Sequence, residues 1–292
     1  MIRSISRITR QIFKNLHFLF FLNGMLLAIV LYCYQEDQYE DDLFNLLSQD
    51  VIEKTRNVSS VAFDDSVVLQ SMHFVHDLEK NRIKYFSNSN FESFKANFLS
   101  PLTFHLMTAN GSCGSFTLIL GRLLRELNYP VRFAQMKVNG EYGGHIILEV
   151  KTKEGWKVLD PLFDLYFTRP DGKLANFEDV KANWSYYAQQ VPADYDLSYR
   201  YEGVQYTNWQ KIPVIMPLTK KVLNFTIGKE NADKVSLRNV VLSKFDFLLK
   251  VILCIYIPLT IWTLYLTSKT SRARKIFSEF SVKRFNFARK VA

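Results

Sequence analysis

Cysteine is scarce in this chain of 292 residues, which has only Cys33, Cys113 and Cys254. Cys33 and Cys254 lie within two long apolar runs, so Cys113 is the only cysteine in the middle of the chain. This arrangement leaves Cys113 without an intramolecular disulfide partner there, and it excludes paired-cysteine metal sites. An unpaired thiol in an oxidising compartment is a liability unless it has a use.

Glycine and proline are also few, with 11 and 8 residues, and the chain has no Gly/Ser-rich or Pro-rich linker and no internal repeat. A phosphate-binding loop and a G-x-S-x-G nucleophile motif are both missing from the sequence. With 48% apolar residues, the chain is too apolar to be disordered throughout. The length fits one large domain, or one domain with extensions.

Positive charge is missing from the middle of the chain, although the whole chain carries a net charge of +9. Residues 35–249 contain 24 Lys/Arg and 27 Asp/Glu, so the basic excess lies on the two terminal segments. A nucleic-acid-binding protein requires positive charge on its folded body. We therefore expect no nucleic-acid partner.

Two apolar runs, residues 17–34 and 251–267, approach the ~20 residues that a helix needs to cross the hydrocarbon core. Lys and Arg residues precede the first run and follow the second: Arg3, Arg7, Arg10, Lys14, Lys269, Arg272, Arg274 and Lys275. The Lys/Arg-rich side of a span usually stays in the cytoplasm. We therefore expect a two-pass protein of a bacterial inner membrane, with both termini cytoplasmic and a periplasmic domain between the spans.

Each apolar run has an alternative interpretation. The first could be a cleaved signal peptide, but no A-x-A site follows it and it ends in the bulky residues 31–34. The second could be a buried core helix, because it contains Pro258 and is flanked by Asp246 and Lys250. The tail, residues 271–292, is either a basic amphipathic segment on the inner leaflet or a loose basic tail.

The expected organisation has five parts. These are a basic cytoplasmic N-terminus at 1–16, a transmembrane helix at 17–34, an extracytoplasmic domain at 35–245 with its core at about 60–190, a transmembrane helix at 246–267, and a basic cytoplasmic tail at 268–292.

The middle of the chain predicts an α+β fold. Residues 41–100 show helical patterns, and a turn at Asn110-Gly111 precedes a strongly periodic helix at 115–127. Three strand-like segments follow, at 131–138, 144–150 and 155–160, separated by turn signals. A helix packed on an antiparallel sheet is the economical arrangement of these elements.

Cys113 is expected at the N-terminal end of that helix, directly after the turn. Free N–H groups and the helix dipole at this end favour the thiolate, which is the reactive form of cysteine. The same N–H groups could hold an oxyanion. The alternative is that Cys113 is a small buried residue that only packs.

His145 opens one predicted strand and Asp160 closes the next. If the hairpin closes around Thr152 and Lys153, an unbulged antiparallel register sets His145 directly opposite Asp160. A carboxylate there would fix the tautomer and orientation of the imidazole. Cys113, His145 and Asp160 would then act as nucleophile, base and orienting acid.

Other residues compete for these roles. His105 could approach Cys113, Asp164 could replace Asp160, and the spacing of His73 and His76 on a predicted helix could suit a metal if a third ligand existed. The aromatic residues of segment 184–209 either line a cleft or pack against one another.

The segment 111–161 resembles the transglutaminase-like superfamily. The matching motifs are GSCGSFTLILGRLLRELNYPVRF, in which a Gly-x-Cys enters a helix, then GGHIILEV, with a His at a strand start, then GWKVLDP. The resemblance implies a papain-like α+β core in which Cys113 is the nucleophile, His145 the base and Asp160 the orienting acid. No obvious calcium loop is found, so neither a metal nor another cofactor is expected.

Together with the two expected spans, this resemblance implies a membrane-anchored thiol enzyme of the cell envelope. It would act on an amide bond of a protein, peptide or glycopeptide through a thioester, as a hydrolase or an acyltransferase. The alternative is a catalytically inactive binding or scaffold module of the same fold, for an envelope peptide or glycan. Partners in envelope assembly are compatible with either hypothesis.

Overall fold

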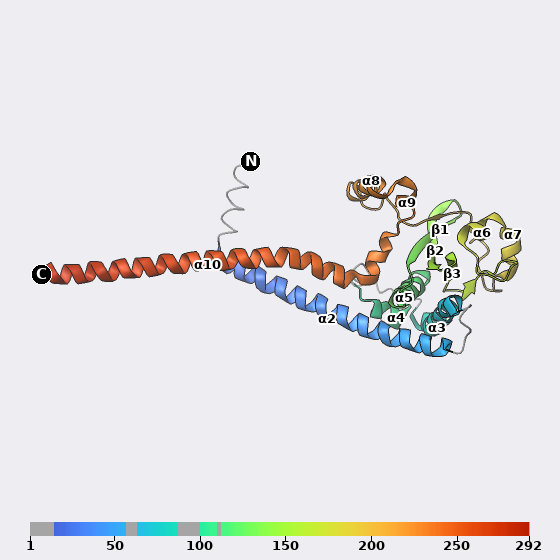
Figure 1. Cartoon of the computed structure of the whole chain (residues 1–292), viewed down its shortest axis with the longest axis horizontal. Coiled ribbons are helices and arrows are strands. Elements are labelled where there is room, and N and C mark those ends of the chain that lie inside the picture. The colour runs from blue at the N-terminus through green and yellow to red at the C-terminus, as the bar shows by residue number, and fades with distance from the viewer. Residues whose placement is uncertain (1–14, 57–62, 87–99, 110–111, 292) are drawn as a thin grey trace. The chain divides into compact units, whose positions relative to one another are not determined.

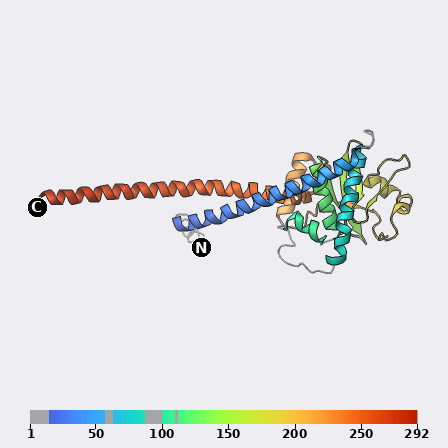
Figure 2. The same cartoon turned by 90° about the horizontal axis from the view of Figure 1, so that it is seen from below.

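The computed structural model describes residues 15–56, 63–86, 100–109 and 112–291, with only the backbone described at 84 and 271–291. Figures 1 and 2 show the chain in two views. It forms two compact units, one made by Met1–Asp37 and Phe245–Ala292, the other by Gln38–Lys244. The predicted turn at Asn110-Gly111 and the basic residues Arg3 to Lys14 lie outside the described residues.

The first unit contains the apolar parts of two long helices, α2 (Leu16–Thr55) and α10 (Lys244–Val291). Both are long and apolar enough to cross a membrane, with a mean hydropathy of 2.1 in each apolar window. Only 11% and 6% of these windows are buried, whereas a core helix of a soluble protein is mostly buried. The two helices therefore indicate association with a lipid bilayer.

A polar cluster joins the two helices inside their apolar segments. The Asn23 side-chain amide donates to the Leu19 carbonyl at 2.7 Å and to Thr263 Oγ1 at 2.9 Å. Thr260 Oγ1 in turn donates to Asn23 Oδ1 at 2.7 Å. Polar side chains in hydrocarbon are stabilised by such interhelical hydrogen bonds. Asn23, which interrupts the first apolar run in the sequence, thus has a structural use.

Replacing Asn23 with leucine is expected to weaken the packing of these two helices by about 1 kcal/mol, because Thr260 and Thr263 lose their partner on α2. Unfolding of the full chain in detergent with increasing dodecyl sulfate measures the effect. Phe21→Leu is the matched control, since the Phe21 side chain is 67% exposed. Equal midpoints for the two variants would contradict the role given to Asn23.

The second unit is α+β, as the sequence predicts. Its five strands form one antiparallel sheet of order β4-β3-β2-β1-β5. The strands are β1 (Val131–Val138), β2 (Glu141–Thr152), β3 (Gly155–Asp160), β4 (Leu165–Tyr166) and β5 (Val204–Gln205). The longer helices are α3 (Phe63–Phe86), α5 (Cys113–Glu126) and α8 (Ile215–Ile227). The short ones are α4 (Leu102–Thr108), α6 (Phe177–Ala182), α7 (Trp184–Tyr187), η2 (Ala188–Gln190), α9 (Lys229–Asp233) and η3 (Leu237–Ser243).

Alternating side chains of the sheet face two separate cores. Phe133, Leu148 and Leu159 belong to the core that includes residues of α3, α4 and α5. Their strand neighbours Ala134, Ile147 and Val158 belong to a second core with α6, α7 and the aromatic segment. Such alternation is what the period of two residues in a strand requires. The helix that carries Cys113 therefore packs on one face of the sheet.

The hairpin between β2 and β3 differs from the expected register. Thr152 pairs with Gly155 and Leu148 pairs with Leu159, so the turn is Lys153-Glu154 and not Thr152-Lys153. Gly155 follows the turn with φ +104°, a conformation that glycine adopts without strain.

Because the observed register is shifted from the expected one, the expectation that His145 lies directly opposite Asp160 was wrong by two residues. A slip of two keeps both side chains on the same face.

Candidate active site

Cys113 is the first residue of α5, as expected. Its side chain is half-buried, and its carbonyl accepts a hydrogen bond of 2.6 Å from Thr117 Oγ1 in the next turn. Ser112 precedes the helix with φ 45°, so the backbone bends sharply just before the thiol. Apart from its chain neighbours and the backbone of the helix, no atom of the described residues lies within 4 Å of the position that a Cβ on Gly114 would occupy. Among the described residues, there is thus open space at Gly114, the second residue of the helix.

His145 and Asp160 form a short, fully enclosed hydrogen bond. His145 Nε2 lies 2.6 Å from Asp160 Oδ2, and the two side chains are 1% and 0% exposed. The observed register makes them diagonal neighbours on one face of the sheet, and such neighbours remain within reach of each other's longer side chains. The pairing predicted from the sequence therefore occurs, although the register that was expected to produce it does not.

A bulge in β2 shapes the strand just before His145. Met136 pairs with His145, but the next residue of β1, Lys137, pairs with Tyr142, so Gly143 and Gly144 are extra residues in β2. Gly143 has φ +105°, and a Cβ on Gly144 would lie 2.7 Å from the Val138 Cβ. Bulges of this kind redirect a side chain at the edge of a site. Both glycines are therefore required for this path of the strand.

The three residues are electrostatically coupled. Burial lowers the pKa of His145, but the charge and hydrogen bond of Asp160, together with Cys113, raise it to about 10. Burial raises the pKa of Cys113, yet hydrogen bonds from His145 and the Ile146 backbone lower it overall. Since Nε2 of His145 is held by Asp160, Nδ1 is the ring nitrogen left for the thiol. The arrangement favours a thiolate beside an imidazolium at neutral pH.

This electrostatic pair predicts how the reactivity of Cys113 depends on pH. The thiol pKa lies below its ordinary value and the His145 pKa is about 10, so the thiol ionises first and the ion pair persists between the two values. Alkylation by iodoacetamide should rise at a lower pH than for a free cysteine and change again near pH 10 as His145 loses its proton. The rate of Cys113 alkylation in the full chain, measured at a series of pH values up to and beyond 10, tests this prediction. A single rise near pH 8.5, the ordinary value of a free cysteine, would refute the ion pair.

Aromatic rings enclose the imidazole. The Tyr199 ring stacks on His145 with centroids 4.3 Å apart and planes 4° from parallel, and the Phe163 ring lies 5.9 Å away. The Tyr195 hydroxyl donates to the Tyr199 carbonyl at 3.2 Å, which fixes the loop that carries the stacking ring. An aromatic face stabilises a nearby cation. Tyr199 therefore helps to orient His145 and to keep it charged.

Arg238, on η3, acts on the same thiol. Burial lowers the pKa of Arg238, and the charge of Cys113 raises it. Arg238 and the Cys113 thiolate therefore attract each other. The causes that set the pKa of Cys113, however, are burial, His145, the Ile146 backbone and Asp160. Neither the coupling of Arg238 nor the stacking of Tyr199 is predicted from the sequence. Arg238 follows Cys113 by more than a hundred residues, and Tyr199 is one of many aromatic residues in its segment, so no local pattern identifies either.

The competing candidates have other partners. Asp164 binds His73, with its carboxylate oxygens 2.7 and 2.8 Å from His73 Nδ1, and does not replace Asp160. His76 Nδ1 lies 3.1 Å from the Pro161 carbonyl, and His105 Nδ1 lies 3.0 Å from Ser115 Oγ. No group of three or more His, Cys, Asp or Glu side chains that could hold a metal occurs among the described residues.

The aromatic segment mainly packs. Most of its rings lie against the second core, including Trp184, Tyr186, Tyr187, Tyr195, Tyr199, Tyr201 and Tyr206. Tyr201 is fully buried and contacts the rings of Phe167, Phe177 and Trp184. Of the two interpretations of this segment, packing is therefore the one that describes most of its rings.

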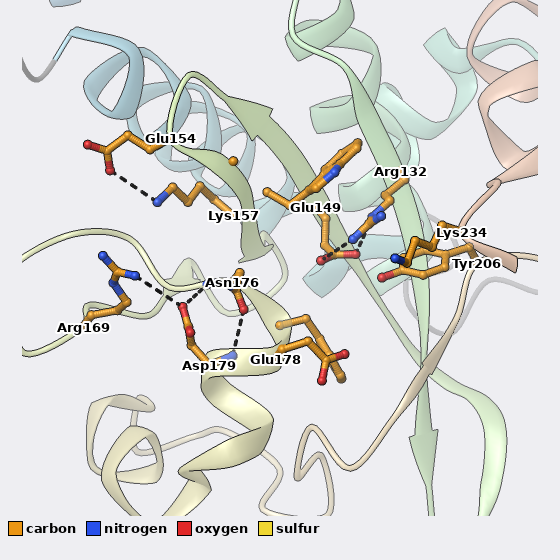
Figure 3. A pocket seen from close by; sticks show the side chains of 13 residues that line it. Arg132, Glu149, Glu154, Lys157, Arg169, Asn176, Glu178, Asp179, Tyr206 and Lys234 are labelled. Carbon is orange, nitrogen blue, oxygen red and sulfur yellow. Dashed lines mark hydrogen bonds and ion pairs between the residues drawn. The ribbon is translucent and has the colours of Figure 1, made fainter. Parts of the chain in front are cut away.

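A pocket of about 510 Å³ opens elsewhere on the second unit, and none of the three candidate catalytic residues lines it. Figure 3 shows its paired charges, with Arg132 against Glu149 at 2.8 Å and Arg169 reaching Asp179 at 3.9 Å. The Arg132 guanidinium also lies between the rings of Trp156 and Tyr206, 4.1 and 4.4 Å from their centroids. The charges of Arg132 and Arg169 in this pocket therefore have partners within the protein.

The fold and the site define a class: an α+β domain with a coupled cysteine, histidine and aspartate, in a chain with two candidate membrane-spanning helices. Comparison of the chain with known family models, curated proteins and solved structures gives no match. The geometry of the site must therefore carry the functional argument.

Proposed function

We propose that this protein is a membrane-anchored thiol enzyme that cleaves or transfers an acyl group from an amide. The observation that carries the proposal is the buried His145–Asp160 pair beside the half-buried Cys113. A buried carboxylate that holds one ring nitrogen, with the other directed at an ionised thiol, is the arrangement that nucleophilic catalysis requires.

In the proposed reaction, the Cys113 thiolate adds to the carbonyl carbon of the substrate amide. The resulting oxyanion is held by N–H groups at the start of α5, beside the open space at Gly114. The protonated His145 then donates its proton to the leaving amine, and the C–N bond breaks to give a thioester on Cys113. Water or a second amine attacks the thioester, His145 accepts the proton of the attacking group, and the thiolate leaves.

The resemblance to the transglutaminase-like superfamily supports the same roles and adds a papain-like core to the proposal. The matched motifs lie on the elements that bear the three residues, namely α5, β2 and β3. The charge distribution of the sequence supports placing the domain on the outer side of a bacterial inner membrane, with both termini in the cytoplasm. Protein, peptide or glycopeptide amides of the envelope are the proposed substrates.

Trapping the acyl-enzyme tests the proposal. The full chain in detergent is mixed with a cell-envelope peptide and glycopeptide extract, quenched in acid, and its mass is determined intact and after digestion. We expect a thioester adduct on Cys113 that hydroxylamine removes. Cys113→Ala should carry no adduct, and His105→Ala, a matched histidine change outside the cluster, should carry the normal one. If Cys113 stays unmodified with every fraction while it reacts rapidly with iodoacetamide, acyl transfer from these amides is refuted.

A further inference from the structure

Helix α8 exposes an apolar stripe. Ile215, Leu218, Val222 and Phe225 are spaced by three, four and three residues, which sets them on one face of a helix. Their side chains are 61%, 60%, 55% and 92% exposed. Single exposed apolar residues are ordinary on soluble domains, but four on one helical face form a contiguous patch. The patch is the kind that marks an interaction surface.

Helix α8 is not a core helix of the second unit. No residue of α8 is buried. The opposite side of the helix is held by Lys220, which pairs with Asp233 at 2.7 Å and lies 5.7 Å from the centroid of the Trp209 ring. The helix is therefore fixed in its orientation through its polar side, and the apolar side is left facing outward.

Charge and chain connection favour a lipid surface as the occupant. Exposed lysines lie on and beside the helix, at Lys211, Lys221 and Lys229. An apolar face bordered by lysines is typical of helices that lie in the boundary between headgroups and acyl chains, where anionic lipids attract the cations. In addition, α10 begins 17 residues after α8 ends, and α10 carries the second candidate membrane span.

We propose that α8 lies in the headgroup region of the bilayer that the chain spans, with Ile215, Leu218, Val222 and Phe225 inserted toward the acyl chains. The lysines contact anionic headgroups. This contact gives the domain a membrane attachment in addition to the two spans. The proposal does not depend on the chemistry of Cys113, so either proposal can fail alone.

Photocrosslinking tests this placement directly. The full chain with p-benzoylphenylalanine in place of Phe225 is reconstituted in phosphatidylethanolamine liposomes with or without phosphatidylglycerol, and is irradiated. Digestion and mass measurement should find a phospholipid adduct on the peptide that contains position 225, with a higher yield when phosphatidylglycerol is present. The control carries the same group at Tyr85, which is 79% exposed on α3, and should show little lipid adduct.

Hydrogen exchange supplies a second measurement. In the liposomes, exchange of the α8 amides should be slower than in detergent by about tenfold, and Leu218→Glu with Phe225→Glu should remove the protection. Cys113 alkylation at the rate of the unmodified chain shows that the domain is still folded. A crosslinked dimer at position 225, or lipid adducts equally abundant at 225 and 85, would overturn the proposal. The dimer would assign the stripe to a second copy of the chain.

Discussion

Replacing His145 with alanine is expected to slow the alkylation of Cys113 by iodoacetamide at about pH 6 by tenfold or more. Only the thiolate reacts, and a cysteine with the ordinary pKa of about 8.5 is roughly 0.3% ionised at that pH. In the unmodified chain, His145 lowers the thiol pKa and so raises the ionised fraction. The lower intrinsic nucleophilicity of a low-pKa thiolate offsets part of that gain, which is why the expected ratio is below the change in ionised fraction.

The measurement uses the full chain in detergent, with peptide mapping to separate Cys113 from Cys33 and Cys254. His105→Ala is the matched control, because His105 is another partly buried histidine of the same unit and bonds to Ser115. It should leave the rate at Cys113 within about twofold of normal. Equal rates in His145→Ala and the unmodified chain would show that Cys113 is a packed thiol and not an activated one.

The sequence predicts which elements carry the three residues of the candidate site, because each position depends on a local pattern. The helical periodicity after Cys113 places the thiol at a helix start, and the turn signals set the strands that carry His145 and Asp160. The strand predicted at 131–138 matches β1, and that at 155–160 matches β3. His145 and Asp160 lie on the same face of two neighbouring strands. They therefore stay within reach of each other although the observed register differs from the expected one by two residues.

The remaining features depend on contacts that are distant in the chain. The stacking of Tyr199 on His145 and the effect of Cys113 on Arg238 arise only once the loops after β4 return to the sheet. The bulge at Gly143 and Gly144 is not specified by a strand pattern, because glycines inside a strand are equally consistent with a turn. The exposed stripe of α8 has the apolar spacing of a core helix, so its exposure is known only from the structure.

Asp160 should matter to both reactivity and stability, and removal of its charge is the second change with a large expected effect. Asp160→Asn keeps a group that can bond to His145 Nε2 but removes the negative charge that raises the imidazole pKa. The effect of burial is then opposed only by Cys113, so the His145 pKa should fall well below about 10. The rise in Cys113 alkylation should therefore move to higher pH than in the unmodified chain, and the change near pH 10 should disappear.

Asp160→Ala should in addition destabilise the domain, by about 3–5 kcal/mol, since it leaves a buried imidazole without its partner. The matched control is Asp164→Ala, which removes the carboxylate of the other histidine–aspartate pair in the same unit. The His73 and Asp164 side chains are 39% and 33% exposed, and exposed pairs contribute less than about 1 kcal/mol. Urea unfolding of the full chain in detergent, followed by the near-ultraviolet signal of its tryptophans, compares the two. Similar losses for both variants would mean that the His145–Asp160 pair is no more than an ordinary ion pair, and the difference between them isolates what burial adds to it.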